Sequence, residues 1–166
     1  VYYLARMIEG GENPEFIARR MVILASEDIG NANPTALVLA TNTLTAIQSI
    51  GMPEGRILLS QCAVYLASSP KSNASYMALE EAMALVKKTG ALPVPLHLRN
   101  PANQLLKTLN YGEDYAYAHT HPGNFVELEF MPQTIAGAKF YKPGDNPREH
   151  EMRAFLKKRW KDKYGY

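Results

Sequence analysis

Residues 13–30, NPEFIARRMVILASEDIG, have the pattern of one amphipathic helix with a defined start and stop. Asn13 is suited to accept a hydrogen bond from a free amide of the first turn, and Pro14 has the φ of a first helical residue. Gly30 is expected to end the helix, because glycine enters the left-handed region at little cost. Apolar residues at three- and four-residue steps form a stripe that faces a core: Phe16, Ile17, Met21, Leu24 and Ala25.

The last turn of this helix carries two carboxylates, Glu27 and Asp28, at the negative end of the helix dipole. An exposed acidic end costs only a few tenths of a kcal/mol, so a tolerated surface feature and a compensated contact both stay open. We hypothesise that a cation from another helix or subunit neutralises the pair, with Arg56, Lys71 and Arg99 as the candidates within the chain. The hypothesis fails if Glu27→Gln with Asp28→Asn changes neither oligomeric state nor thermal stability.

Outward from this helix, an Asn-Pro dipeptide precedes a helical pattern four times, which predicts an N-cap and an N1 proline at each: Asn13-Pro14, Asn33-Pro34, Asn100-Pro101 and Asn146-Pro147. The other predicted helices span 1–9, 34–51, 53–69, 72–90, 101–109 and 147–163. Short connections between most of them are typical of packed antiparallel helices. The fold class predicted is therefore mostly all-α.

The character of the chain changes between residues 92 and 145. Pro93 and Pro95 impose an extended path, and residues 110–145 are rich in Tyr, Gly, His and Pro. Residues 125–130, FVELEF, alternate apolar with acidic side chains, which predicts a short strand paired with residues 139–141 as a β-hairpin. The aromatic content favours packing on the helical body over disorder.

Length and composition are those of an ordinary globular domain, with 166 residues, 46% hydrophobic and 20% charged. The net charge of +2 does not indicate a nucleic-acid binder, but seven basic and three acidic residues gather between Arg148 and Lys163. The single cysteine, Cys62, lies in an apolar run, which favours a buried thiol in a reducing compartment. The uncharged residues 29–53 are too polar for a membrane span, and we expect no secretory signal.

The first residues, VYYLARMIEGG, already have helical spacing, yet no initiator methionine or capping residue precedes them. We therefore expect the chain to be a part of a longer protein. Nothing matches GxxxxGK followed by Ser or Thr, HExxH, GxSxG or a paired-cysteine metal spacing, so we predict no catalysis by this chain.

Two further patterns suggest binding sites. His119 and His121, near Glu127 and Glu129, would share a metal ion on a strand, as in a small metal-dependent enzyme, but Pro122-Gly123 makes a turn there and no third ligand has a fixed spacing. The last helix carries a basic run: Lys157, Lys158, Arg159, Lys161 and Lys163. The run suits DNA phosphate contacts, with Trp160 as a stacking group. Alternatively, it is a solvated face that complements the helix dipole. Tyr111, Tyr115 and Tyr117 suit either base stacking or packing at a subunit boundary.

Six segments in order resemble the C-terminal part of one group of AAA+ ATPases, with matching spacing over essentially the whole chain: ARMIEGGENPEFIARRMVILASEDIG, MPEGRI, YLASSPKSNASY, LHLRNPANQLLKTLNYG, YAHTHPGNF and YKPGD. The group is the replication-associated recombination protein A family, also called maintenance of genome stability protein A. It includes the Werner-helicase-interacting ATPase of eukaryotes.

The resemblance implies that residues 1–30 end the lid region of an ATPase whose Walker motifs, and with them ATP and magnesium, lie outside this chain. Residues 31–166 would be an all-helical domain that holds the ATPase in a homo-oligomer, a tetramer in this family. Members show DNA-stimulated ATPase activity, act at stalled replication forks with single-stranded DNA-binding protein, and work in the cytoplasm at the nucleoid. The residues expected at subunit or domain contacts are Glu27, Asp28, Lys71, Ser72, Asn73, Arg99 and Asn100.

Overall fold

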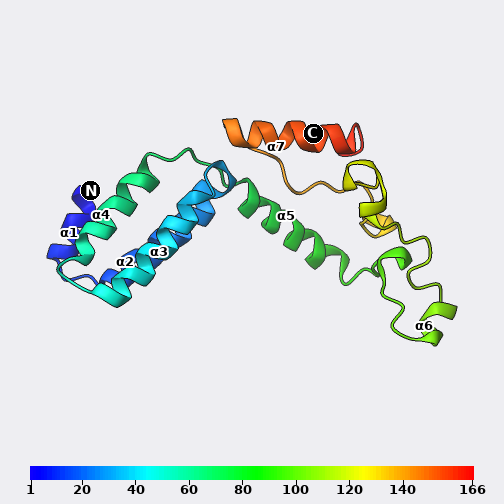
Figure 1. The fold of residues 1–166 in the computed structure, drawn as a ribbon, viewed down its shortest axis with the longest axis horizontal. Helices are drawn as coiled ribbons and strands as arrows, with labels where there is room; N and C mark the ends of the chain where they lie inside the picture. Colours follow the sequence, from blue (N-terminus) through cyan, green and yellow to red (C-terminus); the bar gives the residue numbers. More distant parts are fainter. The chain divides into compact units, whose positions relative to one another are not determined.

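A computed structural model describes residues 1–166 and is built from helices without any strand, which confirms the all-α prediction (Figure 1). The α-helices are α1 (Tyr2–Glu9), α2 (Pro14–Leu24), α3 (Thr35–Ile50), α4 (Gly55–Ala67), α5 (Ala74–Thr89), α6 (Gln104–Thr108) and α7 (Pro147–Trp160). No helix is both long and apolar enough to cross a lipid bilayer.

The chain divides into two compact units. Unit 1 comprises residues 1–80 and 141–152, and unit 2 comprises residues 81–140 and 153–166. Helices α5 and α7 each begin in unit 1 and end in unit 2. The boundary that the sequence places at residue 30 therefore lies inside unit 1, which contains α1 and α2 before it and α3 and α4 after it.

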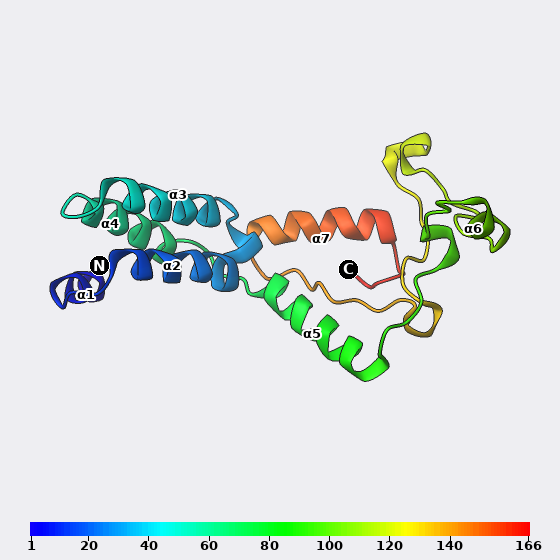
Figure 2. The same cartoon turned by 90° about the horizontal axis from the view of Figure 1, so that it is seen from below.

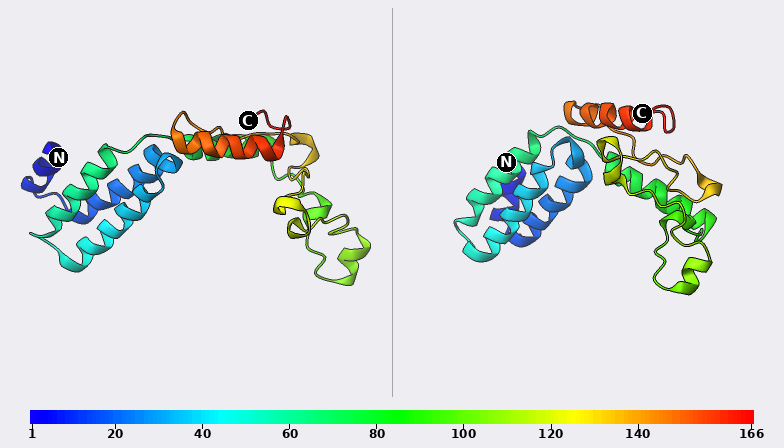
Figure 3. Two further views of the ribbon diagram at one scale, coloured as in Figure 1. Left: turned by 45° about the horizontal axis from the view of Figure 1, so that its top comes forward. Right: turned by 45° about the vertical axis from the view of Figure 1, so that its right-hand side comes forward.

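Unit 1 is a helical bundle in which α2, α3 and α4 lie side by side in every view and α1 packs against α4 (Figures 1, 2 and 3). Its core has two clusters. The first consists of Ala25, Ile29, Ala36, Ala40, Cys62 and Leu66, and the second of Leu4, Ile17, Ala18, Ile47 and Leu59. Alanines at the crossings let the helix backbones approach closely, and the deeply buried Cys62 has its pKa raised by burial, only partly offset by a hydrogen bond with Thr43.

Helix α2 begins as the sequence predicts and ends differently. The Asn13 side chain accepts hydrogen bonds from the amides of Glu15 and Phe16, at 2.8 and 3.2 Å. After Leu24 the chain continues as one π-helical turn, η1 (Ala25–Ile29), and Gly30 terminates it with φ +48°. The predicted helix therefore has the expected limits, but its last turn, with both carboxylates, is wider than an α-helix.

Replacing the cap residue Asn13 with alanine should lower the free energy of unfolding by about 1 kcal/mol, because two first-turn amides lose their acceptor. Asn42→Ala is the matched control, since Asn42 is an exposed residue inside α3, where alanine favours the helix. Urea denaturation of the two variants measures the difference. Equal midpoints would show that the Asn13 cap does not stabilise α2.

The Asn-Pro prediction holds at two of the four positions. Asn146, like Asn13, caps a helix, since its Oδ1 accepts the amide of Glu149. It is wrong at Asn33, whose side-chain amide instead donates to Tyr65 and Ser69 at 3.0 and 3.1 Å and ties α3 to α4. It is also wrong at Asn100, because α6 starts three residues later, where Asn103 caps it.

Unit 2 has short helical turns joined by extended segments: η3 (Leu96–Leu98), η4 (Ala118–Thr120), η5 (Pro122–Asn124) and η6 (Gln133–Ile135), together with α6. Its aromatic centre is Trp160, whose ring meets Phe125, Phe130 and Tyr164 edge-on at centroid distances of 4.9, 6.0 and 4.9 Å. These contacts hold the extended segment 125–130 against the end of α7. The aromatic residues of this segment are packed, as the sequence predicts, and these contacts are made within unit 2.

The predicted β-hairpin at residues 125–130 is wrong. The alternating side chains of this segment serve another purpose: its two phenylalanines contact Trp160, and Glu127 and Glu129 pair with Lys161 and Lys163 at 2.9 and 3.3 Å. Lys163 also donates to the carbonyl of Leu128 at 2.7 Å. Side chains from the end of α7 thus take the place of a partner strand.

Candidate functional site

A buried carboxylate, Glu149, lies at the centre of a polar junction in unit 1. It is fully buried, and no cation pairs with it. The hydroxyl of Tyr141 donates to its Oε1 at 2.7 Å, and the side-chain amide of Asn146 donates to its Oε2 at 2.6 Å. The Ser72 hydroxyl and the Gly144 amide supply two more hydrogen bonds.

Burial alone would raise the pKa of Glu149, but the hydrogen bonds from Ser72, Tyr141, Asn146 and Gly144 outweigh it and hold the pKa below the ordinary value of 4.5. Four donors that converge on one carboxylate stabilise its charged form without a counter-ion. The junction therefore contains a buried negative charge at neutral pH.

Three turns that are far apart in the sequence meet at this junction. Ser72 connects them: its amide donates to the carbonyl of Asp28 at 2.8 Å, and its hydroxyl bonds Glu149. A Cβ added to Gly30 would lie 2.8 Å from the Ser72 carbonyl oxygen, and one added to Gly144 would lie 2.7 Å from Glu149 Oε2. At Gly30 the close neighbour is backbone and at Gly144 it is the carboxylate of the buried Glu149, so a side chain at either position would displace part of the junction.

The residues expected at subunit or domain contacts fall into two groups. Asp28 and Ser72 meet at the junction, although Asp28 contributes its carbonyl oxygen and not its carboxylate. The side chains of Glu27 and Asp28 are exposed, and no cation of the chain pairs with them. Lys71 donates weakly to the Leu66 carbonyl at 3.5 Å, and the carbonyl of Asn73 accepts the Met77 amide in the first turn of α5.

The other two expected contact residues, Arg99 and Asn100, lie in unit 2. Arg99 donates to the carbonyl of Val94 at 2.6 Å and to the hydroxyl of Tyr111 at 3.2 Å, and its guanidinium group lies over the Tyr111 ring. Asn100 is exposed. Arg99 thus connects two loops of unit 2, and its role as a subunit contact stays a prediction.

Sequence reasoning missed Glu149. A signal was present, because Asn146 and Glu149 have the spacing of an N-cap and an acidic N3 residue, the pattern of a capping box. The Asn146 side chain makes both bonds: its Oδ1 accepts the Glu149 backbone amide at 3.0 Å, and its Nδ2 donates to Glu149 Oε2 at 2.6 Å. The contributions of Ser72 and Tyr141 come from remote parts of the chain and have no local signal.

The basic run at the end of α7 is largely paired within unit 2. Lys161 and Lys163 bind Glu127 and Glu129, and Arg159 donates to the carbonyl of Gly123 at 3.0 Å. Lys157 and Lys158 are exposed and have no acidic partner in the chain. The pKa of Glu129 is lowered, because hydrogen bonds from Met131, Lys163 and Gly137 and the Lys163 charge outweigh its desolvation.

A cavity of about 480 Å³ lies beside this run, between residues 122–127 and α7. The guanidinium group of Arg159 lies over the rings of Phe125 and Phe155, at 5.1 and 4.6 Å from their centroids. Lys158 also lines the cavity. Aromatic walls with a positive rim suit a flat or apolar anion.

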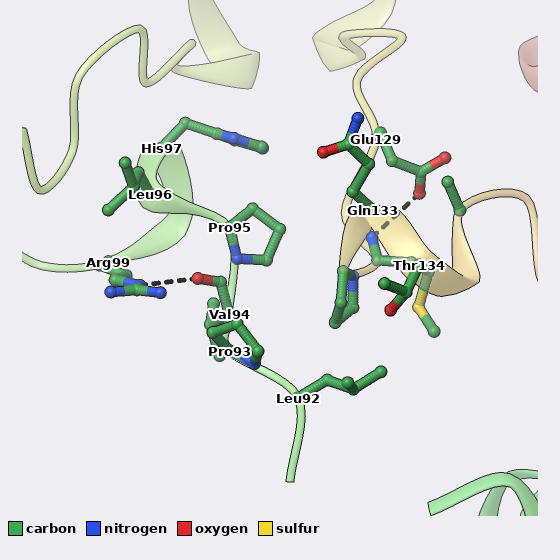
Figure 4. A pocket seen from close by; sticks show the side chains of 13 residues that line it. Leu92, Pro93, Val94, Pro95, Leu96, His97, Arg99, Glu129, Gln133 and Thr134 are labelled. Carbon is green, nitrogen blue, oxygen red and sulfur yellow. Dashed lines mark hydrogen bonds between the residues drawn. The ribbon is translucent and has the colours of Figure 1, made fainter. Parts of the chain in front are cut away.

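A second cavity of unit 2, of about 460 Å³, separates segment 92–99 from segment 129–136 (Figure 4). Pro95 and His97 face Gln133 and Thr134 across it. The imidazole Nε2 of His97 is buried and has no hydrogen-bond partner. The cavity wall is otherwise mainly apolar, so it suits an apolar group that carries one hydrogen-bonding atom.

The histidines of the HxH motif show no metal-site geometry. His119 lies against the ring of Tyr117, with the centroids 5.2 Å apart, in a turn that continues into Pro122-Gly123. No group of three or more histidine, cysteine or carboxylate side chains lies close enough to hold a metal ion.

Comparisons with known proteins agree with the resemblance found in the sequence. A family model described as MgsA AAA+ ATPase C terminal matches residues 1–160. The chain is 44% identical to a replication-associated recombination protein A of Coxiella burnetii over 86% of its length, and 39% identical to one of Escherichia coli strain K12 over 92%. It is also 40% identical to the ATPase WRNIP1 of Dictyostelium discoideum over 85%.

These matches cover 33%, 34% and 16% of the three relatives, so the chain spans about a third of the bacterial proteins and less of the Dictyostelium one. The family match extends over nearly the whole chain, and the relatives share more than a third of its residues. The chain is a member of the MgsA AAA+ ATPase C-terminal family.

Proposed function

We propose that this domain holds its AAA+ ATPase in a homo-oligomer and has no catalytic role of its own. The observation that carries the proposal is the state of unit 2: none of residues 81–140 and 153–166 is buried. Large apolar side chains are exposed throughout the unit: Met83, Val86, Val94, Leu96, Leu105, Leu109, Tyr115, Tyr117, Phe130 and Phe155. Surface of this kind marks a protein–protein interface.

A unit in which no residue is fully buried gains less hydrophobic free energy than a domain with a closed core. Contacts with further copies of the chain would supply it, as in oligomers whose interfaces resemble a divided core. The number of copies proposed is four, as the family resemblance implies. The oligomer would bring several ATPase portions together, so that separate ATP and DNA sites act in concert.

The names of the relatives support a role in replication and recombination. We propose that the whole protein is a DNA-dependent ATPase that acts at replication forks, with its ATP and magnesium site outside this chain. A single-stranded DNA-binding protein is its proposed partner, and the nucleoid its proposed location.

Thermal unfolding at several protein concentrations tests the oligomer proposal. Because association stabilises the folded state by mass action, the melting temperature of the isolated chain should rise with its concentration over a hundredfold range. A melting temperature independent of concentration would count against self-association.

A second candidate function is nucleic-acid binding, favoured by the cavity beside α7. There Arg159 stacks on two phenyl rings, and Lys158 has no acidic partner in the chain. The pairing of Lys161 and Lys163 with glutamates weighs against a large phosphate-binding surface. At most a short single strand would bind, with one base on Phe155.

Neutralising Lys157 and Lys158 to glutamine tests this second function by fluorescence anisotropy with single-stranded DNA at two salt concentrations. If the surface binds phosphates, the variant should bind several-fold more weakly and with a shallower salt dependence. Lys87→Gln with Lys88→Gln removes the same charge from α5 and serves as control. If both double variants weaken DNA binding equally, the attraction is non-specific and the surface beside α7 is not a DNA-binding site.

A further inference from the structure

Helix α5 leaves one face without a partner in the chain. Its half-buried residues share one side of the helix: Ala74, Ala78, Glu81, Ala82, Leu85 and Thr89. The opposite side is exposed and apolar, with Leu79 58% and Val86 61% accessible. No residue of α5 is buried, although it is one of the two longest helices of the chain.

The exposed face has the spacing of a coiled-coil seam. Tyr76, Leu79, Met83 and Val86 follow one another at intervals of three, four and three residues, which places them in one stripe. Such a stripe packs against a second helix by interlocking side chains. The helix that covers it must come from outside this chain, or the apolar stripe stays in water.

Charges beside the stripe indicate which helix fits. Glu80 and Lys87 stand seven residues apart and therefore on the same flank of the stripe. Both are exposed, and neither makes a hydrogen bond or ion pair within the chain. In a parallel pair of α5 helices, Glu80 and Lys87 would face the uncharged Ser75 and Ala82 of the other copy. In an antiparallel pair, each Glu80 comes near the Lys87 of the other copy.

We propose that α5 pairs antiparallel with α5 of a second copy of this chain, about a twofold axis between Met83 and Val86. The pairing rests on the self-association proposed above and names its surface. Met83 of each helix then packs against Val86 of the other. The two Glu80–Lys87 pairs lie on the same flank and are exchanged by the twofold axis, so the contact is the same on the two copies, as a twofold interface requires.

The surface beside the stripe also suits a copy of itself. Within unit 2, Val86 lies on the rim of a cavity of about 320 Å³, whose lining includes Leu85, Leu92 and Ile135 and no charged residue. A methionine side chain from the second copy can enter such a cavity without desolvating a charge. The exposed surface of α5 therefore offers both the projecting Met83 side chain and the cavity that receives the Met83 of the other copy.

A charge exchange tests the pairing by sedimentation equilibrium. Glu80→Lys and Lys87→Glu should each weaken association roughly tenfold, because two ion pairs per dimer become two repulsions. The double variant Glu80→Lys with Lys87→Glu should restore the affinity to within about threefold of the wild type. Met83→Asp should abolish this association. Ile57→Asp, at an exposed apolar position of α4, is the control and should leave it unchanged.

Circular dichroism of each variant shows that α5 remains helical. If the wild type associates but both single exchanges and Met83→Asp leave its affinity unchanged, the α5 pairing is wrong and self-association stands. If the exchanges weaken association and the double variant does not recover, Glu80 and Lys87 do not meet across a twofold axis, and the antiparallel pairing is also wrong. A wild type that stays monomeric at every concentration overturns the pairing together with the proposed function.

Discussion

Replacing Glu149 with alanine should lower the free energy of unfolding by roughly 3 kcal/mol or more. The substitution leaves the buried donors of Ser72 and Asn146 and the half-buried hydroxyl of Tyr141 without this acceptor, and each buried unpaired donor costs about 1–3 kcal/mol. Urea denaturation followed by circular dichroism measures the loss. Glu151→Ala is the control, because this neighbouring carboxylate of α7 is exposed and should change stability by less than about 0.5 kcal/mol. Equal losses in the two variants would remove the special role of Glu149.

The same carboxylate gives unit 1 a specific dependence on acid. Since the folded state holds the pKa of Glu149 below 4.5, the unfolded chain takes up this proton more readily, and stability falls as the pH drops below that value. Above it, the contribution of Glu149 is complete. The stability difference between wild type and Glu149→Gln should therefore be constant at neutral pH and shrink in acid. A difference that grows in acid would contradict the stabilised charge.

Gly30→Ala should be the second large effect, a loss of roughly 3 kcal/mol. An alanine there takes a left-handed φ that suits glycine, and its Cβ would lie 2.8 Å from the backbone oxygen of Ser72. Gly11→Ala is a matched control: its φ is also positive, at +79°, but its Cβ meets nothing within 4 Å. Gly11→Ala should cost only about 1 kcal/mol. Chemical denaturation of both variants separates the clash from the strain, and similar losses would show that the Ser72 backbone can move aside.

Local signals were enough to predict the helices of unit 1. The cap of Asn13, the stop at Gly30 and the apolar stripe between them are all encoded within a few residues of one another. The π-helical turn at residues 25–29 has no such signal. Its carbonyl at Asp28 accepts the amide of Ser72, a contact between segments more than forty residues apart.

Unit 2 shows where periodicity misleads. The alternation in residues 125–130 is typical of a strand, yet the two glutamates bind lysines at the end of α7 and the two phenylalanines contact Trp160. A two-residue period states only that alternate side chains have different surroundings. It does not distinguish a neighbouring strand from the side chains of a helix end.

The residues proposed for subunit or domain contacts were chosen for local features of the sequence. Ser72 was chosen for its turn, and its amide bonds the carbonyl of Asp28. Glu27 and Asp28 were chosen for their charge, and no cation of the chain pairs with them. Glu149 resembled any acidic residue in a first helical turn. Its importance arises from Ser72 and Tyr141, which only the tertiary fold brings to it.

Self-association of this chain is the central claim, and multi-angle light scattering across a wide concentration range tests it most directly. A monomer has a mass of 18.5 kDa. The account predicts a mass that is a multiple of this value and that falls toward it on dilution, with Met83→Asp shifted to smaller species. A mass of 18.5 kDa at every concentration would contradict it.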